Sequence, residues 1–466
     1  MLIFEIIYGF FQYIFLLYFL LIALIYAFST YLGIREIVQY YNRLSQRSLN
    51  SILERDSYVP ISILVPSYNE EASIVASVRS FLTLHYPEFE VIVASDGSSD
   101  ATLDLLTQAY DLYEIAYPYE ERVVTQAVKR VFRSARFPNL IVLDKENGGK
   151  GDAMNAALNI AQYPIVCAVD ADSLLDNDAL LRTARLFLED ETVVGVGATI
   201  RALNGATIEE GKIRQLKLPK SFIARMQILE YSRAFFGGRT GWASVDALMI
   251  ISGAFGVFKR DILTQLGGWS SQTITEDIEL MLRIHKYYHD AGIPYRIEFI
   301  PEPLCWTEVP EDLASLRKQR NRWHRGLFEV LMMYRDMIFN PKYGMIGMVA
   351  VPYYWLVEAL SPLIEVGGYI FVIVALYFNV LPVEFWLALT ILALLYGTLV
   401  TQLAMGVEAL LVNRYDRLSD RLILMGMSLI EFFGYRQILL FERLIATFQV
   451  QSKRGQWGKM KRTGFQ

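Results

Sequence analysis

The chain has 466 residues, of which 53% are hydrophobic and 13% aromatic, and its net charge is -5. This length exceeds what one hydrophobic core organises, and the apolar fraction is high for a soluble protein, so part of the chain is expected in a membrane. The charge indicates no particular partner, and nothing predicts a nucleic acid. Only two cysteines are present, Cys167 and Cys305, which argues against a disulfide framework and a cysteine-based zinc site.

Residues 1–34 are predicted to form a membrane-spanning helix. No charged residue occurs from Ile6 to Ile34, which is long enough to cross a hydrocarbon core about 30 Å thick. No lysine or arginine precedes this run and no small-residue cleavage site follows it, so a signal anchor is favoured over a signal peptide. The predicted linker over 35–57 then carries Arg35, Arg43, Arg47 and Arg55. By the positive-inside bias, the N-terminus lies outside and the middle of the chain lies in the cytoplasm.

Residues 58–326 alternate short β-rich runs with helical runs, which is typical of an α/β domain with a mixed, mostly parallel sheet and flanking helices. Strands followed by turns or loops are predicted in ISILVPSYNE (61–70), FEVIVASDGSSD (89–100), LIVLDKENGGKGDAMNAALNIA (140–161) and YPIVCAVDADSLL (163–175). In such sheets, ligands bind beyond the carboxyl ends of the strands. One crevice is therefore expected to collect the polar residues at these ends, namely Glu70, Asp96, Lys150, Asp170 and Asp172.

Two of these strand ends carry the chemistry of a phosphate site. Asp170 and Asp172, spaced D-x-D in an extended segment, would point the same way and suit Mg²⁺ or Mn²⁺ carrying a substrate phosphate. The alternative is an ordinary turn, where aspartate is common, and the same holds for Asp96 in DGSSD. The glycines of ENGGKGDAMN let backbone approach a ligand and Lys150 would meet negative charge, although the spacing is not that of a P-loop.

Two further motifs fall on predicted helices. TITEDIELMLRIH places Glu276 and Asp277 in the first turn of a helix capped by Thr275, where the dipole favours ionised carboxylates. The alternative for this motif is plain helix capping. RKQRNRWHRG places Gln319, Arg322 and Trp323 on one helix face, and the alternative there is a basic surface that faces lipid headgroups.

The chain becomes apolar again after residue 326. An interfacial helix is predicted over 327–343, and residues 344–450 are predicted to hold transmembrane and interfacial helices. Two spans, Val366–Val383 and Phe385–Val407, are expected with a short external turn between them. The following apolar segment carries Glu431, Arg436, Glu442 and Arg443, which favours a helix facing protein, water or the interface, and both a hairpin and an in-plane helix remain open.

Taken in order, the motifs resemble the membrane-embedded processive glycosyltransferases of family 2, which include cellulose, hyaluronan, chitin and poly-N-acetylglucosamine synthases. The matching motifs are VPSYNE, SDGSSD, GGKGDAMN, the D-x-D at 170–172, SGAFG at 252–256, TED at 275–277 and Q-x-x-R-W at 319–323. Each motif alone is weak, but the ordered set is specific. The resemblance implies a cytoplasmic GT-A domain, inserted between transmembrane and interfacial helices of a multi-pass protein of the plasma (inner) membrane.

The resemblance also implies a reaction. Sugar would pass with inversion from a UDP-sugar to the end of a growing β-linked polysaccharide, which then crosses the lipid bilayer. Asp96 would contact uracil, Asp170 would lie near the diphosphate, Asp172 would bind Mg²⁺ or Mn²⁺, and Lys150 would neutralise phosphate. Asp277 would be the general base. Gln319, Arg322 and Trp323 would hold the pyrophosphate and stack on the acceptor sugar, roles for which the chemistry of each side chain is suited.

The basic tail over 451–466 contains RGQWGKMKRTGF, which is similar to the gating segment of hyaluronan and chitin synthases. Trp457 and Arg462 would fill the aromatic and basic places of a lid over the nucleotide. GKMKR departs from the commoner Gly-Thr sequence of that segment. The alternative is a basic tail that touches anionic lipid.

Two other functions remain open from the residues. A non-processive transferase would glycosylate a lipid carrier, although such enzymes generally lack the Q-x-x-R-W tryptophan or have fewer spans after the domain. A receptor or channel would only bind nucleotide-sugar. The donor sugar, glucose, N-acetylglucosamine or alternating glucuronate and N-acetylglucosamine, is also open, as are accessory export or assembly subunits.

For the processive function, Trp323 is predicted to lie where the pocket opens into a polar passage. The passage is predicted to be lined by Glu358, Glu365, Glu408, Glu431 and Arg436, with Tyr353, Tyr354 and Trp355 nearby.

Overall fold

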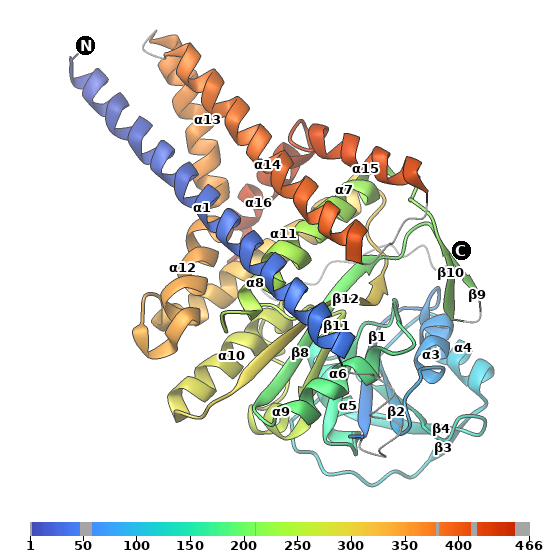
Figure 1. The fold of residues 1–466 in the computed structure, drawn as a ribbon. Helices are drawn as coiled ribbons and strands as arrows, with labels where there is room; N and C mark the ends of the chain where they lie inside the picture. The colour runs from blue at the N-terminus through green and yellow to red at the C-terminus, as the bar shows by residue number, and fades with distance from the viewer. Residues whose placement is uncertain (1, 47–57, 210, 379–381, 412–416, 453–466) are drawn as a thin grey trace.

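The computed structural model describes residues 2–46, 58–209, 211–378, 382–411 and 417–452. The predicted lid residues Trp457 and Arg462 lie outside these ranges, so the tail prediction is not tested by the fold. An α/β domain occupies the lower part of Figure 1, and long helices from both ends of the chain extend away from it on one side.

A mixed ten-stranded sheet forms the centre of the α/β domain, in the order β3-β4-β5-β2-β1-β6-β11-β8-β12-β7. Its strands are β1 Ile61–Ser67, β2 Phe89–Asp96, β3 Leu112–Ile115, β4 Val128–Ser134, β5 Leu140–Lys145, β6 Ile165–Val169, β7 Ser173–Leu175, β8 Val193–Ala202, β11 Phe255–Lys259 and β12 Arg296–Thr307. Strands β5, β2, β1 and β6 pair in parallel, as does β8 with β12. The predicted α/β class and its flanking helices are confirmed.

Strands β1 and β6 are buried along their whole length, and β2 and β5 at all but one residue each, because helices cover both faces of the sheet. The covering helices are α3 Ile74–Leu82, α4 Thr102–Tyr110, α5 Lys150–Ile160, α6 Ala179–Glu189, α9 Arg260–Gln265 and α10 Glu276–Ala291. A small hairpin, β9 Ala206–Glu209 with β10 Lys212–Leu216, stands apart from the main sheet. Because β1, β2 and β6 run in the same direction, their carboxyl ends meet at one edge.

A helical layer connects the sheet to the long helices. It consists of α7 Phe222–Ser232, the π-helical turn η1 Arg233–Arg239, α8 Thr240–Ala243 and α11 Leu313–Met333. Residues 327–343, predicted as a separate interfacial helix, instead form the end of α11 and the 3₁₀ turns η2 Arg335–Met337 and η3 Pro341–Tyr343. Gly326 does not end the helix, because no proline follows until Pro341, so the amphipathic pattern continues α11 and Pro341 starts η3 beyond its end.

The remaining helices are those expected in or at the membrane. They are α1 Leu2–Gln46, η4 Ile346–Ala350, α12 Val351–Tyr353, η5 Tyr354–Ala359, α13 Ser361–Tyr377, α14 Val383–Leu411, α15 Leu418–Ile430 and α16 Tyr435–Gln449. Segments Tyr8–Leu44 and Trp386–Ala409 are long and apolar enough to cross a membrane. Two bent helix pairs, 346–377 and 418–449, raise the number of candidate spans in the described part of the chain to as many as four. The predicted membrane association is confirmed at this level.

Candidate active site

One cavity of about 1850 Å³ begins at the carboxyl ends of β1, β2 and β6 and continues past α10 and α11 to the membrane-side helices. All eight predicted site residues within the described ranges line it, namely Asp96, Lys150, Asp170, Asp172, Asp277, Gln319, Arg322 and Trp323. A pocket for one small molecule usually has a volume of about 300–1000 Å³. The cavity therefore has room for more than a nucleotide-sugar.

Asp96, at the end of β2, fastens the glycine-rich loop before α5. Its Oδ1 accepts hydrogen bonds from Lys145 Nζ at 2.5 Å and Gly148 N at 2.9 Å, and its Oδ2 accepts one from Gly149 N at 2.8 Å. Gly149 has φ 89°, a backbone conformation that favours glycine. Since a carboxylate offers about four acceptor positions, one remains for a hydrogen-bond donor of a ligand.

Lys145 is a functional neighbour that the motifs did not reveal. Its ammonium is fully buried and lies 2.5 Å from Asp96 Oδ1 and 2.6 Å from Asp152 Oδ1. Asp152 in turn accepts a hydrogen bond from Gln126 N at 3.0 Å. The lysine in LIVLDKENGG, at the end of an otherwise apolar strand, was the available signal, because a buried cation there needs carboxylate partners.

We expect Lys145→Met to lower the stability of the protein by about 3 kcal/mol or more, because it leaves two buried carboxylates without their cation. Thermal unfolding in detergent micelles should show a Tm lower by about 5 °C or more. Lys129→Met, on the exposed face of β4, is the matched control and should unfold like the parent. A Tm of Lys145→Met equal to that of the control would contradict the assignment of this network.

Lys150, the first residue of α5, joins three motifs. Its Nζ lies 2.7 Å from Asp170 Oδ1 and 3.1 Å from Glu276 Oε1, and it donates to the carbonyl of Gly253 at 3.2 Å. Burial lowers the pKa of Lys150, but Asp170 and Glu276 outweigh it, so the pKa lies above its ordinary value. Burial raises the pKa of Glu276, against the opposing effect of Lys150. The ammonium is therefore held charged at the strand ends.

Asp170 and Asp172 lie in a turn between β6 and β7, and the prediction of an extended D-x-D segment was wrong. Ser173 N donates to the Asp170 carbonyl at 3.1 Å, which closes the turn. The two side chains consequently have different partners: Asp170 pairs with Lys150, and Asp172 accepts a hydrogen bond from Thr307 Oγ1 at 3.4 Å. The turn arises because β6 must reverse to pair β7 with β12.

The donor set fits a divalent cation bound together with a phosphate. Within the described ranges, no group of three or more His, Cys, Asp or Glu side chains is arranged to hold a metal ion alone. Mg²⁺ usually takes one or two carboxylates and completes its shell with water and substrate phosphates. Asp172, a carboxylate on the cavity wall, meets that requirement.

Asp277 lies in the first turn of α10 and is only partly buried. Its Oδ2 accepts a hydrogen bond from Gly253 N at 3.2 Å and its Oδ1 one from Ile278 N at 2.9 Å. A side chain at Gly253 would meet Lys150 Nζ at 2.7 Å, which explains the glycine in SGAFG. Backbone donors therefore orient the carboxylate while it faces the cavity.

Thr275 occupies the N-cap position of α10, but its side chain makes no capping hydrogen bond, contrary to the prediction. Its hydroxyl lies against Gly326 of α11 and has no hydrogen-bond partner among the described residues. The physical reason is packing, because α11 crosses the start of α10 at this point. The first turn of α10 is thus fixed by Asp277 and its neighbours rather than by a cap.

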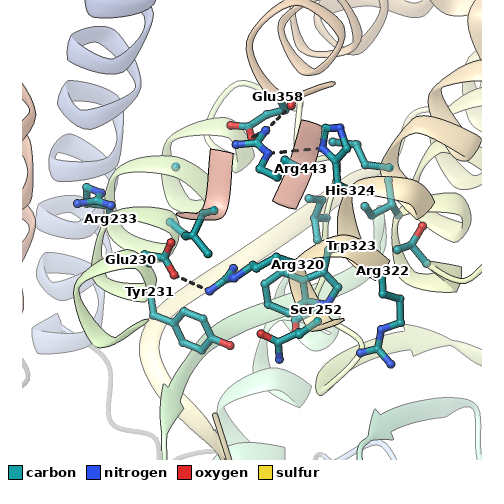
Figure 2. Close-up of a pocket in the computed structure, with 18 of the residues that line it drawn as sticks. Glu230, Tyr231, Arg233, Ser252, Arg320, Arg322, Trp323, His324, Glu358 and Arg443 are labelled. Carbon is teal, nitrogen blue, oxygen red and sulfur yellow. Dashed lines mark hydrogen bonds and ion pairs between the residues drawn. The ribbon is translucent and has the colours of Figure 1, made fainter. Parts of the chain in front are cut away.

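Helix α11 supplies Gln319, Arg322 and Trp323 to the cavity wall, as predicted. Burial lowers the pKa of Arg322, and Glu276, Asp170 and Asp277 oppose that shift, which indicates that the guanidinium faces these carboxylates. Figure 2 shows Arg322 directed away from the ring of Trp323. Arg322 and Trp323 are therefore directed to different parts of the cavity.

Trp323 is held by residues that the motif analysis missed. The Arg320 guanidinium lies 4.5 Å from the centre of the Trp323 ring, and Arg320 forms an ion pair with Glu230 of α7. Figure 2 shows this pair above Tyr231, which also lines the cavity. The R-x-x-W spacing within RKQRNRWHRG was a usable signal, because residues three apart meet on a helix.

Beyond Trp323, the cavity wall is formed by the membrane-side helices and is lined by paired charges. The pairs are Arg233–Glu431, Arg443–Glu358 and Arg436–Glu365. Figure 2 shows Arg443 between Glu358 and His324. Tyrosines lie among them on the wall, namely Tyr18, Tyr26, Tyr353, Tyr354 and Tyr396.

Two residues predicted in this part of the cavity have other roles. Glu408 is buried near the end of α14, where it pairs with Arg201 of β8 at 2.5 Å and accepts a hydrogen bond from Ser232 Oγ of α7 at 2.5 Å. Trp355 packs its ring against Phe328 of α11, with ring centres 5.3 Å apart. Neither residue lines the cavity.

Residues 59–147 and 108–326 match the family described as "Glycosyltransferase like family 2". A poly-beta-1,6-N-acetyl-D-glucosamine synthase from Staphylococcus epidermidis is 29% identical over 297 residues, 63% of this chain and 61% of that protein. The protein of the same name from Staphylococcus aureus (strain COL) is 30% identical over 317 residues, 67% of this chain and 66% of that protein. The chain thus matches less than two thirds of these relatives' length.

A solved structure resembles the fold. The mannosyltransferase from Pyrobaculum calidifontis, in complex with GDP-Man and Mn²⁺, aligns with a TM-score of 0.52 and 18% identity. The alignment covers 92% of this chain and 99% of that one. The likeness confirms the predicted GT-A type of fold.

Proposed function

The chain belongs to glycosyltransferase family 2, and we propose that it is an inverting polysaccharide synthase that extends a β-linked polymer from a UDP-sugar and passes the polymer across the membrane. The observation that carries this proposal is the continuity of the cavity. A single space begins among Asp96, Lys150 and Asp170 at the strand ends and reaches Glu365 and Arg436 of the membrane-side helices.

In the proposed reaction, Asp277 accepts the proton of the acceptor sugar hydroxyl as the hydroxyl oxygen attacks the anomeric carbon. The bond from that carbon to the diphosphate breaks at the same time, UDP leaves, and the configuration inverts. Asp277 suits the role because backbone donors orient it and its carboxylate faces the cavity. A single displacement requires no second carboxylate as nucleophile.

The leaving diphosphate needs positive charge, which Lys150 of α5 and Arg322 of α11 supply at the cavity wall. Asp172 would hold Mg²⁺ or Mn²⁺, which when bound neutralises charge on the phosphate oxygens. Lys150 is already paired with Asp170 and Glu276, so a bound diphosphate would share its ammonium with them. Asp96 would use its remaining acceptor position for the uracil ring.

In this proposal, Trp323 lies between the part of the cavity where sugar is transferred and the part through which the polymer leaves. Its ring would stack on the acceptor sugar, since pyranose faces pack well on aromatic rings. The charged pairs beyond it lie in helices where ionisable groups are costly against lipid, and a hydrated polymer path gives them a polar surrounding. The passage is what favours a polymer over the single-sugar lipid product of a non-processive transferase, the second candidate function.

The function is tested by UDP release and product size with purified protein in detergent. UDP-N-acetylglucosamine is the first donor to try, because of the relatives' names, followed by UDP-glucose and UDP-glucuronate. We expect turnover with one donor and a polymeric product. A single-sugar lipid product would favour the non-processive enzyme, and no turnover with any donor would favour a receptor.

Trp323→Ala is expected to shorten the polymer at least about tenfold while slow donor hydrolysis remains measurable, because the variant removes the acceptor platform but no group at the diphosphate. Product length is measured by gel filtration and hydrolysis by UDP release. Phe328→Ala, which removes an α11 aromatic outside the cavity, is the control for local packing. Polymer of parental length from Trp323→Ala would refute the stacking role.

A further inference from the structure

Arg239, at the end of η1, lies on the cavity wall and belongs to no motif considered so far. Tyr231, Phe235 and Arg239 follow one another at intervals of four residues on α7 and η1, and all three line the cavity. The rings of Tyr231 and Phe235 are 5.7 Å apart, and the Arg239 guanidinium carbon lies 4.2 Å from the centre of the Phe235 ring. The three side chains form a continuous wall segment of two rings and one cation.

The cation of Arg239 differs from its neighbours in having no carboxylate. Arg233, Arg320, Arg436 and Arg443 line the same cavity, and each forms an ion pair with a glutamate. Among the residues that the structure describes, Arg239 has no ion-pair partner, and its Nη1 is buried without a hydrogen-bond partner. Leaving a buried guanidinium donor unmatched costs free energy, so a ligand that supplies an acceptor oxygen would be favoured there.

The electrostatic surroundings of Arg239 include Asp277 and two tyrosines of the cavity wall. Burial lowers its pKa, and the groups that oppose the shift are Tyr354, Asp277 and Tyr231. Arg322 instead faces Glu276 and Asp170 in addition to Asp277. Arg239 and Arg322 are therefore both within electrostatic range of Asp277, and Arg239 is also within range of Tyr231 and Tyr354 on the cavity wall.

Building on the proposed function, we propose that Arg239 is a specificity residue for the acceptor sugar, and that its guanidinium donates hydrogen bonds to the carbonyl oxygen of an acylamino substituent on the terminal unit. The wall suits both parts of that substituent. The guanidinium of Arg239 meets the carbonyl oxygen, and the half-buried Tyr231 ring on the same wall segment offers an apolar surface for the acyl methyl group.

Other substituents fit less well. A uronate carboxylate would match the guanidinium but would also stand near the carboxylate of Asp277, and like charges at close range repel. A free amino group is protonated at neutral pH, so it would be repelled by Arg239. A plain hydroxyl forms a weaker hydrogen bond to the guanidinium and leaves the Tyr231 ring uncovered.

The test uses the full chain in detergent with UDP-N-acetylglucosamine and three β-linked trisaccharide acceptors, carrying acetylated amines, free amines or a terminal glucuronate. Arg239→Gln and Arg239→Lys are compared with the parent. Arg214→Gln is the matched control, since Arg214 lies on the β9–β10 hairpin, pairs with Glu209 and does not line the cavity. UDP binding by calorimetry shows that each variant is folded.

We expect the parent to prefer the acetylated acceptor. In Arg239→Gln, the KM for that acceptor should rise about 10- to 100-fold, with donor KM and UDP affinity unchanged. The KM for the free-amine acceptor should stay level or fall, because the repelling charge is gone. The KM of Arg239→Lys for the acetylated acceptor should lie between those of the parent and Arg239→Gln, since an ammonium keeps the charge but lacks the planar guanidinium.

An unchanged acceptor preference in Arg239→Gln would overturn this assignment while leaving the synthase function intact. If the parent prefers the glucuronate acceptor and Arg239→Gln loses that preference, Arg239 binds a carboxylate, and the assignment to an acylamino group is also overturned. A raised donor KM would move Arg239 to the donor sugar. Failure of the parent to extend any acceptor would refute the proposed function itself, and with it this assignment.

Discussion

Asp277→Asn is expected to lower sugar transfer by about 10²- to 10⁴-fold, the usual contribution of a positioned general base. An amide cannot accept the proton of the acceptor hydroxyl at neutral pH. It has nearly the same shape as the carboxylate and keeps one acceptor oxygen for Gly253 N or Ile278 N, so the loop and α10 should stay in place. The loss should therefore appear in kcat rather than in donor affinity.

The measurement is UDP release under saturating donor, together with UDP binding by calorimetry. Asp261→Asn is the matched control, because Asp261 is an exposed carboxylate in the first turn of α9 that bonds the next backbone N–H at 2.8 Å, as Asp277 does. The control should turn over like the parent. Turnover of Asp277→Asn within about tenfold of the parent would exclude Asp277 as the base.

The part of the site at the strand ends was predictable from the sequence. Strands β1, β2 and β6 are recognisable in the sequence as apolar runs, and their parallel arrangement puts their carboxyl ends at one edge of the sheet. Polar residues that follow such runs, including Asp96 and Asp170, must then share a crevice. The position of Trp323 at the far side of it follows less directly, from helix periodicity alone.

The pairing of the site residues depends on which side chains meet across long distances in the chain, and sequence periodicity does not encode this. Asp170 was expected to act with Asp172, yet its partner is Lys150, contributed by α5. Thr275 occupies the predicted N-cap position, but its hydroxyl packs against Gly326 of α11 and makes no capping hydrogen bond. Spacing alone identifies the residue types that a site needs, whereas packing decides which of them pair.

The membrane-side residues show the same limit. Glu358, Glu365, Glu431 and Arg436 all line the cavity, as expected for ionisable groups in apolar helices. Glu408 has a similar sequence environment but forms an ion pair with Arg201 of the sheet domain. A charged residue near the end of a span can face the cavity or the sheet domain, and only the packing of α14 on α7 and η1, which brings Glu408 to Arg201, distinguishes the two.

Asp172→Ala is expected to weaken metal-dependent UDP binding by at least about 100-fold, the upper end of the losses seen when even an outer ligand partner is removed. Of the two D-x-D carboxylates, Asp172 is the one whose charge is not matched by Lys150, since that ammonium lies on Asp170. UDP affinity is measured by calorimetry in Mg²⁺, in Mn²⁺ and in a chelator. Chelation should weaken binding by the parent and have little further effect on the variant.

Two controls separate metal binding from general damage at the turn. Asp178→Ala removes a carboxylate six residues further along, which lies outside the cavity and pairs with His85, so it should keep the metal dependence. Asp170→Ala should also keep most of the metal dependence of UDP binding, because that variant frees Lys150 to face the diphosphate directly and leaves Asp172 in place. If Asp170→Ala loses the metal dependence and Asp172→Ala retains it, the cation is held by the carboxylate that Lys150 now occupies, and the lysine would have to move away whenever donor binds. If chelation leaves UDP binding by the parent unchanged, Lys150 and Arg322 alone neutralise the diphosphate and the metal assignment fails.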